Sequence, residues 1–188
     1  PLPPHLLWRK RVVMKIITTS KECAAFCRKL GKEEFITVDT EFMRERSYYA
    51  KLCLIQIGGA KEAAVIDPLA EDMDLEPVFK LFANKKVLKV FHAARQDIEI
   101  FVQMCGKVPT PLFDTQVAGM VCGFGESASY QTLAETLAKA KIDKSSRFTD
   151  WAARPLSNKQ LEYALADVTH LRTVYEKMKA KLEETKRT

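Results

Sequence analysis

The chain has 188 residues, enough for one domain with a sizeable core, and its 47% hydrophobic and 29% charged residues are ordinary for a globular protein. A cytoplasmic location is expected, because no apolar run approaches the roughly 20 residues that span a bilayer and the opening residues lack a signal-peptide cleavage site. In that compartment, the five cysteines suggest neither a disulfide framework nor a zinc site. The net charge of +6 permits a polyanionic partner but does not identify one.

The first residues differ in composition from the rest of the chain. Residues 1–13 are rich in proline and then in basic residues, and Met14 begins the first patterned segment. We expect Met14 to be a natural start, residues 1–13 to be an N-terminal extension that could be non-native, and residues 14–188 to form one domain. Intact-mass analysis of the native protein would test this expectation.

Strand-like and helical patterns then alternate along the chain. A strand is expected at 12–19, and the helix after it would have Ser20 as its N-cap and end at Gly31. Four further strands are expected at 35–39, 51–57, 63–67 and 87–91. Two further helices are expected at 75–82 and 93–106. Strands that cluster early and helices that cluster later predict an α/β domain with a mixed sheet.

The C-terminal element has the clearest sequence signal. The residues SNKQ, from Ser157 to Gln160, form a capping box, and Pro155 precedes it as a boundary. Apolar residues then recur at helical spacing as far as Leu182, which predicts one long helix. The final residues EETKRT are polar and are expected to fray.

Two acids directly follow an apolar segment, in the stretch VDTEF. In a strand, residues two apart point to the same face, so Asp39 and Glu41 would project together. Like charges this close disfavour each other unless a cation or hydrogen bonds compensate. The alternative is a strand that ends here with both carboxylates solvated. On spacing alone, the solvated strand end is the favoured interpretation.

A third acid, Asp97, lies in the helix expected after the strand at 87–91. Acids near helix N-termini usually complement the helix dipole, which is its simplest role. The helical repeat, however, places Asp97 close to the apolar face of this helix, with Ala94 and Ile98. His92 lies at the strand-to-helix junction, where open α/β sheets often bind ligands, although a cap or a structural histidine is the favoured interpretation.

A phenol and a carboxylate share one surface of the expected C-terminal helix. Tyr163 and Asp167 are four residues apart and therefore project from the same side. Asp167 lies among apolar residues, and a half-buried acid there needs a partner. A local hydrogen bond between the two side chains would suffice. None of the three acidic groups is decisive by itself.

Together the three groups resemble the motifs of a known enzyme family. The segments VDTEF, FHAARQDIEIF and YALAD resemble, in order, the three motifs of the ribonuclease D branch of the DEDD superfamily of 3′–5′ exonucleases. YALAD has the Tyr-xxx-Asp form that defines the tyrosine subgroup. The similarity runs from about Lys15 to the end of the long helix. It implies a ribonuclease H-like α/β fold, in which helices flank a mixed β-sheet to form a 3′–5′ exonuclease domain.

The resemblance also implies a metal site. Four carboxylates in this family bind two divalent ions, Mg²⁺ or Mn²⁺, and the matching residues here are Asp39, Glu41, Asp97 and Asp167. Hard cations prefer oxygen ligands, and their charge relieves the repulsion among clustered acids. Tyr163 would orient the attacking water and could help to remove its proton.

Residues next to these motifs are candidates for substrate contacts. The candidates to contact the terminal nucleotide are Phe42, Met43, His92 and Gln96, each of which could equally pack in the core. The candidates to contact phosphates are Lys144, Arg147 and Arg154, although Arg154 could instead tie its loop to the helix below. Asp114 is interpreted mainly as a helix N-cap, and Asp143 also matches a family position.

The favoured functional hypothesis is a metal-dependent 3′–5′ exoribonuclease that releases nucleoside 5′-monophosphates. Its partner would be RNA with a free 3′ end, such as a tRNA precursor, and no membrane or obligate protein partner is evident. The family's full-length enzymes continue into HRDC domains, so the chain is expected to be a catalytic-domain fragment or a short form. The alternatives are a DNA-directed exonuclease on the same fold, a catalytically silent nucleic-acid-binding module and an acid-rich structural domain.

Overall fold

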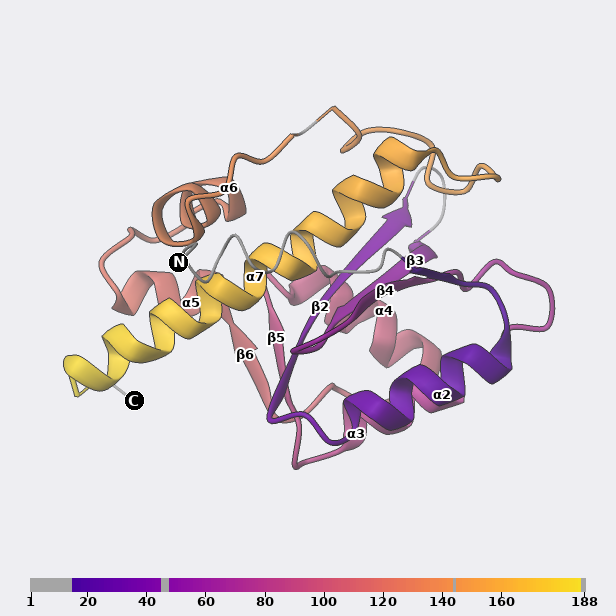
Figure 1. Ribbon diagram of the computed structural model, residues 1–188, viewed down its shortest axis with the longest axis horizontal. Helices are drawn as coiled ribbons and strands as arrows, with labels where there is room; N and C mark the ends of the chain where they lie inside the picture. The colour runs from indigo at the N-terminus through magenta and orange to yellow at the C-terminus, as the bar shows by residue number, and fades with distance from the viewer. Residues whose placement is uncertain (1–14, 45–47, 144, 187–188) are drawn as a thin grey trace.

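The computed structural model describes residues 15–44, 48–143 and 145–186, and a six-stranded mixed sheet lies at its centre (Figure 1). The strands are β1 (Lys15–Ile17), β2 (Phe35–Met43), β3 (Lys51–Gly58), β4 (Ala63–Ile66), β5 (Leu88–Phe91) and β6 (Leu112–Asp114). Their order across the sheet is β1-β4-β3-β2-β5-β6. The central hairpins β2–β3 and β3–β4 are antiparallel, whereas β1–β4, β2–β5 and β5–β6 are parallel. The predicted mixed sheet is therefore confirmed.

Helices cover both faces of this sheet. They are α2 (Ser20–Leu30), α3 (Glu76–Ala83), α4 (Arg95–Cys105), α5 (Thr115–Val121), α6 (Tyr130–Leu133), the π-helical turn η1 (Ala134–Ala138) and α7 (Asn158–Glu184). Helices α2, α3 and α4 pack against one face, and the long α7 runs diagonally across the other (Figure 1). The capping box at Ser157 and Gln160 is present. Among the described residues, no helix combines the length and the apolar character needed to cross a bilayer.

The alternation of side chains along β2 decides which face receives each residue. Ile36 and Val38 are fully buried in the core beneath α2–α4. Phe35 and Thr37 point to the opposite face, where the Phe35 ring lies 4.5 Å from that of Tyr175 in α7. The Thr37 hydroxyl donates to the Val168 carbonyl of α7 at 2.7 Å. The same alternation sends the next odd-numbered residues of β2 toward α7.

Gly58, the last residue of β3, lets α7 approach the sheet closely. A Cβ atom there would lie 2.6 Å from the Thr37 Oγ1 atom and 3.2 Å from the Val168 carbonyl oxygen. A side chain at this position would therefore push α7 away from β2. Because glycine has no side chain, the residues of α7 can contact those of β2.

Strand β2 is longer than the sequence indicated. It continues through Met43 rather than ending at Asp39, because pairing with β3 runs on past Glu41 opposite Leu54, through a register shift, to Met43 opposite Lys51. The prediction of a solvated strand end is therefore wrong. A sequence pattern along one strand does not reveal how far its partner extends.

The cap of helix α2 also differs from the prediction. Thr19 is the N-cap, and its hydroxyl accepts from the backbone N–H of Glu22. The Ser20 hydroxyl instead donates to the Asp72 carbonyl and accepts from the Asp74 N–H in the loop before α3. The expectations for residues 1–13 and for Met14 fall outside the described residues. No element was expected at strand β6 or helix α6, whereas α5 follows Asp114, the predicted N-cap.

An ion pair fixes the loop that leads into α7. The Arg154 Nε and Nη2 atoms each donate to the Asp67 carboxylate at 2.7 Å. The remaining guanidinium donors reach the carbonyls of Cys53, Trp151 and Ala153. All five guanidinium N–H groups are thereby used within the protein. Arg154 ties this loop to β3 and to the end of β4, so it has no donor left for a phosphate.

Removing this guanidinium (Arg154→Ala) is expected to lower the free energy of unfolding by about 2–4 kcal/mol, because Asp67 would remain buried without its counter-charge. Urea unfolding of both proteins would measure the change. Lys29→Ala is the matched control, since Lys29 and Glu62 form an exposed pair. That substitution should cost less than about 1 kcal/mol. Equal losses in the two variants would contradict a structural role for Arg154.

Candidate active site

Three carboxylates from two distant segments converge between β2 and α7. One carboxylate oxygen from each of Asp39, Glu41 and Asp167 lies within 4.8 Å of the others. Asp39 and Glu41 share the face of β2 that α7 covers, and Asp167 projects from α7 toward them. Asp167 is buried, and the other two are half-buried. The structure therefore brings together three of the four acids that the sequence motifs predicted.

The fourth acid, Asp97, reaches this region from the first turn of α4. It is buried, and its Oδ1 atom accepts a hydrogen bond of 2.5 Å from the Thr40 hydroxyl. Thr40 lies between Asp39 and Glu41 on β2 and points to the opposite face. Asp97 is not within the close group of three, yet its negative charge contributes to raising the pKa of Asp39 and of Glu41. It lies beside the cluster, oriented by Thr40.

Burial raises the pKa of all four acids and is the largest cause in each case, and the charges of other acids in the cluster add to the rise at Asp39 and Glu41. The pKa of Asp97 rises to about 6, that of Asp167 to about 7 and that of Glu41 to about 9. The pKa of Asp39 lies well above its usual value, through burial and the charges of the other three acids. Ionising the whole cluster near neutral pH is therefore unfavourable unless a cation compensates.

The residues present fit a site for hard divalent cations. The cluster offers only oxygen ligands, which Mg²⁺ and Mn²⁺ prefer, and its repulsion is what such ions relieve. A second observation lies across the strand pair, where Gln56 of β3 is opposite Asp39. The Gln56 amide is buried and has no hydrogen-bond partner among the described residues. Because directly paired residues share a face of the sheet, this unsatisfied amide lies on the same side as the Asp39 carboxylate.

Without divalent ions, the protein is expected to lose stability as the pH rises from about 4 toward about 9. Because the folded-state pKa values of these acids exceed the unfolded values, the folded protein binds more protons across this window. Raising the pH therefore lowers the free energy of unfolding. Thermal unfolding should show this slope in the wild type and a weaker one in Asp39→Asn.

Metal addition provides the complementary measurement. Mn²⁺ near pH 8, at about 100 times its Kd, should raise the Tm by about 5 °C or more. The gain should shrink near pH 5, where protons compete for the carboxylates. A Tm that Mn²⁺ leaves unchanged at the higher pH would contradict a cation site.

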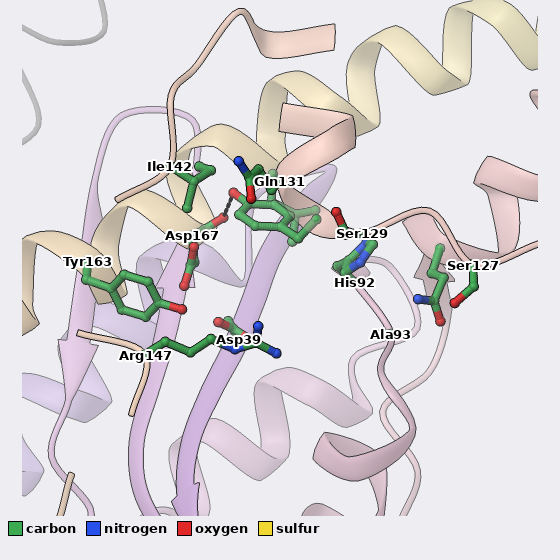
Figure 2. Close-up of a pocket in the computed structure, with 13 residues that line it drawn as sticks. Asp39, His92, Ala93, Ser127, Ser129, Gln131, Ile142, Arg147, Tyr163 and Asp167 are labelled. Carbon is green, nitrogen blue, oxygen red and sulfur yellow. Dashed lines mark hydrogen bonds between the residues drawn. The ribbon is translucent and has the colours of Figure 1, made fainter. Parts of the chain in front are cut away.

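Tyr163 stands beside the acids as the sequence predicted. Figure 2 shows the side chains of Tyr163, Asp167, Asp39 and Arg147 converging. Burial and the charges of Asp167, Glu41 and Asp39 raise the pKa of Tyr163, so the phenol keeps its proton and remains a hydrogen-bond donor. Its interaction with Asp167, together with the charge of Arg147, partly offsets the rise in the Asp167 pKa.

These side chains open into a pocket of about 370 Å³. Its lining comes from β2, the β5–α4 junction, α5, α6, the loop before α7, and α7 itself: Asp39, His92, Ala93, Gln116, Ser127, Ser129, Tyr130, Gln131, Ile142, Arg147, Tyr163, Asp167 and Leu171. Acidic groups lie at one end, while hydroxyl and amide side chains line much of the remainder. The pocket therefore extends well beyond the carboxylates.

The predicted substrate contacts are only partly gathered at this pocket. His92 lines it, whereas Phe42, Met43 and Gln96 do not. Phe42 packs on the core beneath α2–α4, Met43 packs on the core beneath α7, and Gln96 is exposed on α4. A substrate role for these residues remains a prediction.

Three basic residues in the loop before α7 were predicted to contact phosphates, and one of them lines the pocket. Arg147 lines the pocket, while Arg154 is held by Asp67. Lys144 lies outside the described residues. The exposed Asp143 carboxylate accepts from the backbone N–H of Ser145.

Sequence reasoning missed a tyrosine that supports the site. The Tyr130 hydroxyl donates to the Asp167 carbonyl at 2.6 Å, and its ring lies 5.6 Å from that of His92. It thereby connects α6 to the turn of α7 that carries Asp167. The segment around Tyr130 has no strong periodicity, and no local pattern indicated this contact.

Asp114 has a larger role than a simple N-cap. Its carboxylate accepts from the N–H of Gln116, as predicted for a cap. It also accepts from the N–H groups of Ala93 and Ala94 at 2.9 Å each. These bonds join the start of α5 to the β5–α4 junction and hold the turn that presents His92.

Comparisons with known proteins give this site a family context. Residues 14–183 match a protein family described as 3′–5′ exonuclease. A ribonuclease D from Jannaschia sp. (strain CCS1) is 58% identical over 176 residues, which are 92% of this chain and 46% of that protein. A ribonuclease D from Acidiphilium cryptum (strain JF-5) is 58% identical over 167 residues, covering 89% of this chain and 43% of that protein. The chain spans about half the length of these curated relatives.

Solved structures agree with the sequence comparisons. Escherichia coli RNase D has a TM-score of 0.88 and 36% identity, over 92% of this chain and 46% of that one. Brucella melitensis NrnC, solved with bound Mg²⁺, has a TM-score of 0.76 and 26% identity, over 95% of this chain and 84% of that one. These matches confirm the fold and the resemblance to ribonuclease D that the three motifs predicted. The chain therefore belongs to the 3′–5′ exonuclease family.

Proposed function

We propose that this chain hydrolyses RNA from its 3′ end and releases nucleoside 5′-monophosphates. The observation that carries the proposal is the meeting of Asp39, Glu41 and Asp167 with the Tyr163 phenol at one end of a pocket. The ribonuclease D relatives support RNA as the substrate, and the Escherichia coli structure is described as an exoribonuclease involved in structured RNA processing. By this analogy, tRNA precursors are the proposed substrates and the cytoplasm the proposed location.

The proposed ligands of two divalent ions, Mg²⁺ or Mn²⁺, are Asp39, Glu41, Asp97 and Asp167. The Mg²⁺ bound in the related NrnC structure supports this assignment. When bound, such ions make a water more acidic and stabilise negative charge on the phosphate and on the leaving oxygen. The Thr40 hydroxyl holds the Asp97 carboxylate, and Tyr130 holds the turn of α7 that carries Asp167.

The chain's own side chains would position the reacting groups. The Tyr163 phenol would hold the attacking water in line with the scissile P–O3′ bond. Water oxygen then bonds to phosphorus as the bond to the 3′ oxygen breaks, and the 3′ oxygen gains a proton. The products are a 5′-monophosphate and an RNA with a new 3′ hydroxyl. Arg147, from the loop before α7, would contact the non-bridging phosphate oxygens.

An assay with four oligonucleotides tests this proposal. Single-stranded RNA and DNA, each with a 3′ hydroxyl or a 3′ phosphate, are incubated with Mg²⁺, with Mn²⁺ or with EDTA, and products are separated by chromatography. We expect 5′-mononucleotides from RNA with a 3′ hydroxyl, slower release from the 3′-phosphate form and none in EDTA. Degradation in EDTA would contradict the proposal. Faster release from DNA would favour the DNA-directed alternative, and tight binding without release would favour the silent module.

A further inference from the structure

Figure 2 places His92 in the pocket, apart from the Tyr163 and Arg147 side chains at the acidic end. The turn that carries it is held firmly. Ala93 adopts a positive φ of 55°, which is uncommon for a residue other than glycine, and two backbone N–H groups of the turn donate to Asp114. Such a constrained junction fixes the direction in which the imidazole projects.

The hydrogen bonds around His92 define which ring nitrogen carries the proton. Thr115 has a single hydroxyl hydrogen, and its Oγ1 atom donates to the Phe91 carbonyl at 3.1 Å. With that hydrogen on the Phe91 carbonyl, the contact of 3.0 Å between Thr115 Oγ1 and His92 Nδ1 is assigned as Nδ1–H donating to the hydroxyl oxygen. Burial lowers the pKa of His92, so the ring is neutral near physiological pH. The Nε2 atom is therefore left as a hydrogen-bond acceptor.

The Nε2 atom has no hydrogen-bond partner in the part of the chain that the structure describes, since Thr115 is the partner of the imidazole there. His92 is only partly buried and lines the pocket, so a ligand there can offer this Nε2 atom the hydrogen-bond donor that it lacks. The phosphates of a nucleic acid carry no donor. Base N–H groups differ from one nucleotide to the next, so they cannot serve an enzyme that removes every nucleotide in turn. The sugar donors common to all ribonucleotides at a 3′ end are the 2′-hydroxyl and the terminal 3′-hydroxyl, and of these only the 2′-hydroxyl is absent from DNA.

We propose that His92 Nε2 accepts a hydrogen bond from the 2′-hydroxyl of a nucleotide at the reacting 3′ end, and that Thr115 sets the tautomer required for this contact. The inference rests on the proposed exonuclease function and adds a basis for preferring RNA to DNA. His92 is then a specificity-determining residue, and Thr115 is a positioning residue that acts through it.

Histidine NMR tests the tautomer without any substrate. In ¹⁵N-labelled protein, the ring nitrogens of His92 are assigned by comparison with His92→Phe. We expect a protonated Nδ1 and an unprotonated Nε2 in the wild type, and an exchanging mixture in Thr115→Val. A protonated Nε2 in the wild type would overturn the proposal.

Oligonucleotides with one altered sugar test the contact itself. The substrates are RNAs in which one of the last three nucleotides carries 2′-fluoro or 2′-deoxy, since 2′-fluorine keeps a ribose-like sugar but cannot donate. At one of these positions, both changes should lower kcat/KM of the wild type about fivefold. In His92→Phe, the ratio of kcat/KM for unmodified RNA to kcat/KM for the altered RNA should fall to about one, because the 2′-hydroxyl of unmodified RNA would also lack an acceptor. In Thr115→Val the ratio should be intermediate.

The results separate this inference from the function on which it rests. If the wild type releases nucleotides and His92→Phe keeps the same fivefold ratio, the 2′-hydroxyl contact is wrong while the exonuclease function stands. The same holds if the wild type discriminates at none of the three positions. If the wild type releases no nucleotide from any RNA with Mg²⁺ or Mn²⁺, the proposed function fails and this inference fails with it.

Discussion

Replacing Asp39 with asparagine (Asp39→Asn) is expected to lower the rate of nucleotide release by about 10³-fold or more, a loss of several kcal/mol of transition-state stabilisation. Asp39 lies at the centre of the cluster, since the charges of the other three acids all raise its pKa. The neutral amide keeps the size of the carboxylate but removes a charged oxygen ligand. Single-turnover cleavage of 5′-labelled RNA would measure the loss.

Stability distinguishes a lost ligand from a lost fold in this variant. Without divalent ions, Asp39→Asn should be at least as stable as the wild type near pH 8, because it removes one repelling charge. Glu71→Gln is the matched control, since Glu71 is exposed and far from the cluster in sequence. That variant should retain wild-type activity. An Asp39→Asn protein that is folded and fully active would show that the carboxylate is not a functional ligand.

Removing only the hydroxyl of Tyr163 (Tyr163→Phe) is expected to lower kcat by about 10²–10³-fold, the range for a group that positions or moves a proton. The ring packs near Trp151, with 6.0 Å between centroids, so phenylalanine should keep the same place. Because the phenol is assigned to the water and not to the metals, Mn²⁺ affinity should stay close to that of the wild type. Calorimetric titration and single-turnover rates would test both parts.

The control for this variant is Tyr48→Phe, which removes a hydroxyl from a tyrosine that is 89% exposed. Its activity should match the wild type. A Tyr163→Phe protein that loses Mn²⁺ binding in proportion to its activity would argue that Tyr163 supports the metal site instead of the attacking water.

Local patterns were sufficient to predict the elements that carry the acids. The period of two along β2 put Asp39 and Glu41 on one face, and the capping box defined where α7 begins. The spacing of Tyr163 and Asp167 put both on one side of that helix. These features depend on neighbouring residues, which is why the sequence alone could indicate them.

The contacts that bring the acids together are not local. Thr40 reaches Asp97 across 57 residues, and Thr37 reaches Val168 across 131 residues. The length of β2 depends on its pairing with β3, and the close approach of α7 depends on Gly58. No single stretch of sequence contains this information. The motif resemblance supplied it instead, because related chains share the arrangement.

The segment between α4 and α7 was the least predictable. Strand β6 has three residues and α6 has four, too few to show a period. This segment supplies Ser129 and Tyr130, which line the pocket, and Thr115, which contacts His92. The part of the pocket that could distinguish one substrate from another is therefore the part that local sequence patterns described least.

The most direct test of the central claim is the release of 5′-mononucleotides from single-stranded RNA, measured as a function of Mn²⁺ concentration for the wild type and Asp39→Asn. The account predicts stepwise shortening of the wild-type substrate from its 3′ hydroxyl, saturating with Mn²⁺, and no comparable release by the folded variant. Equal release by the two proteins, or release by the wild type that EDTA does not stop, would contradict a metal-dependent exonuclease centre at this carboxylate cluster.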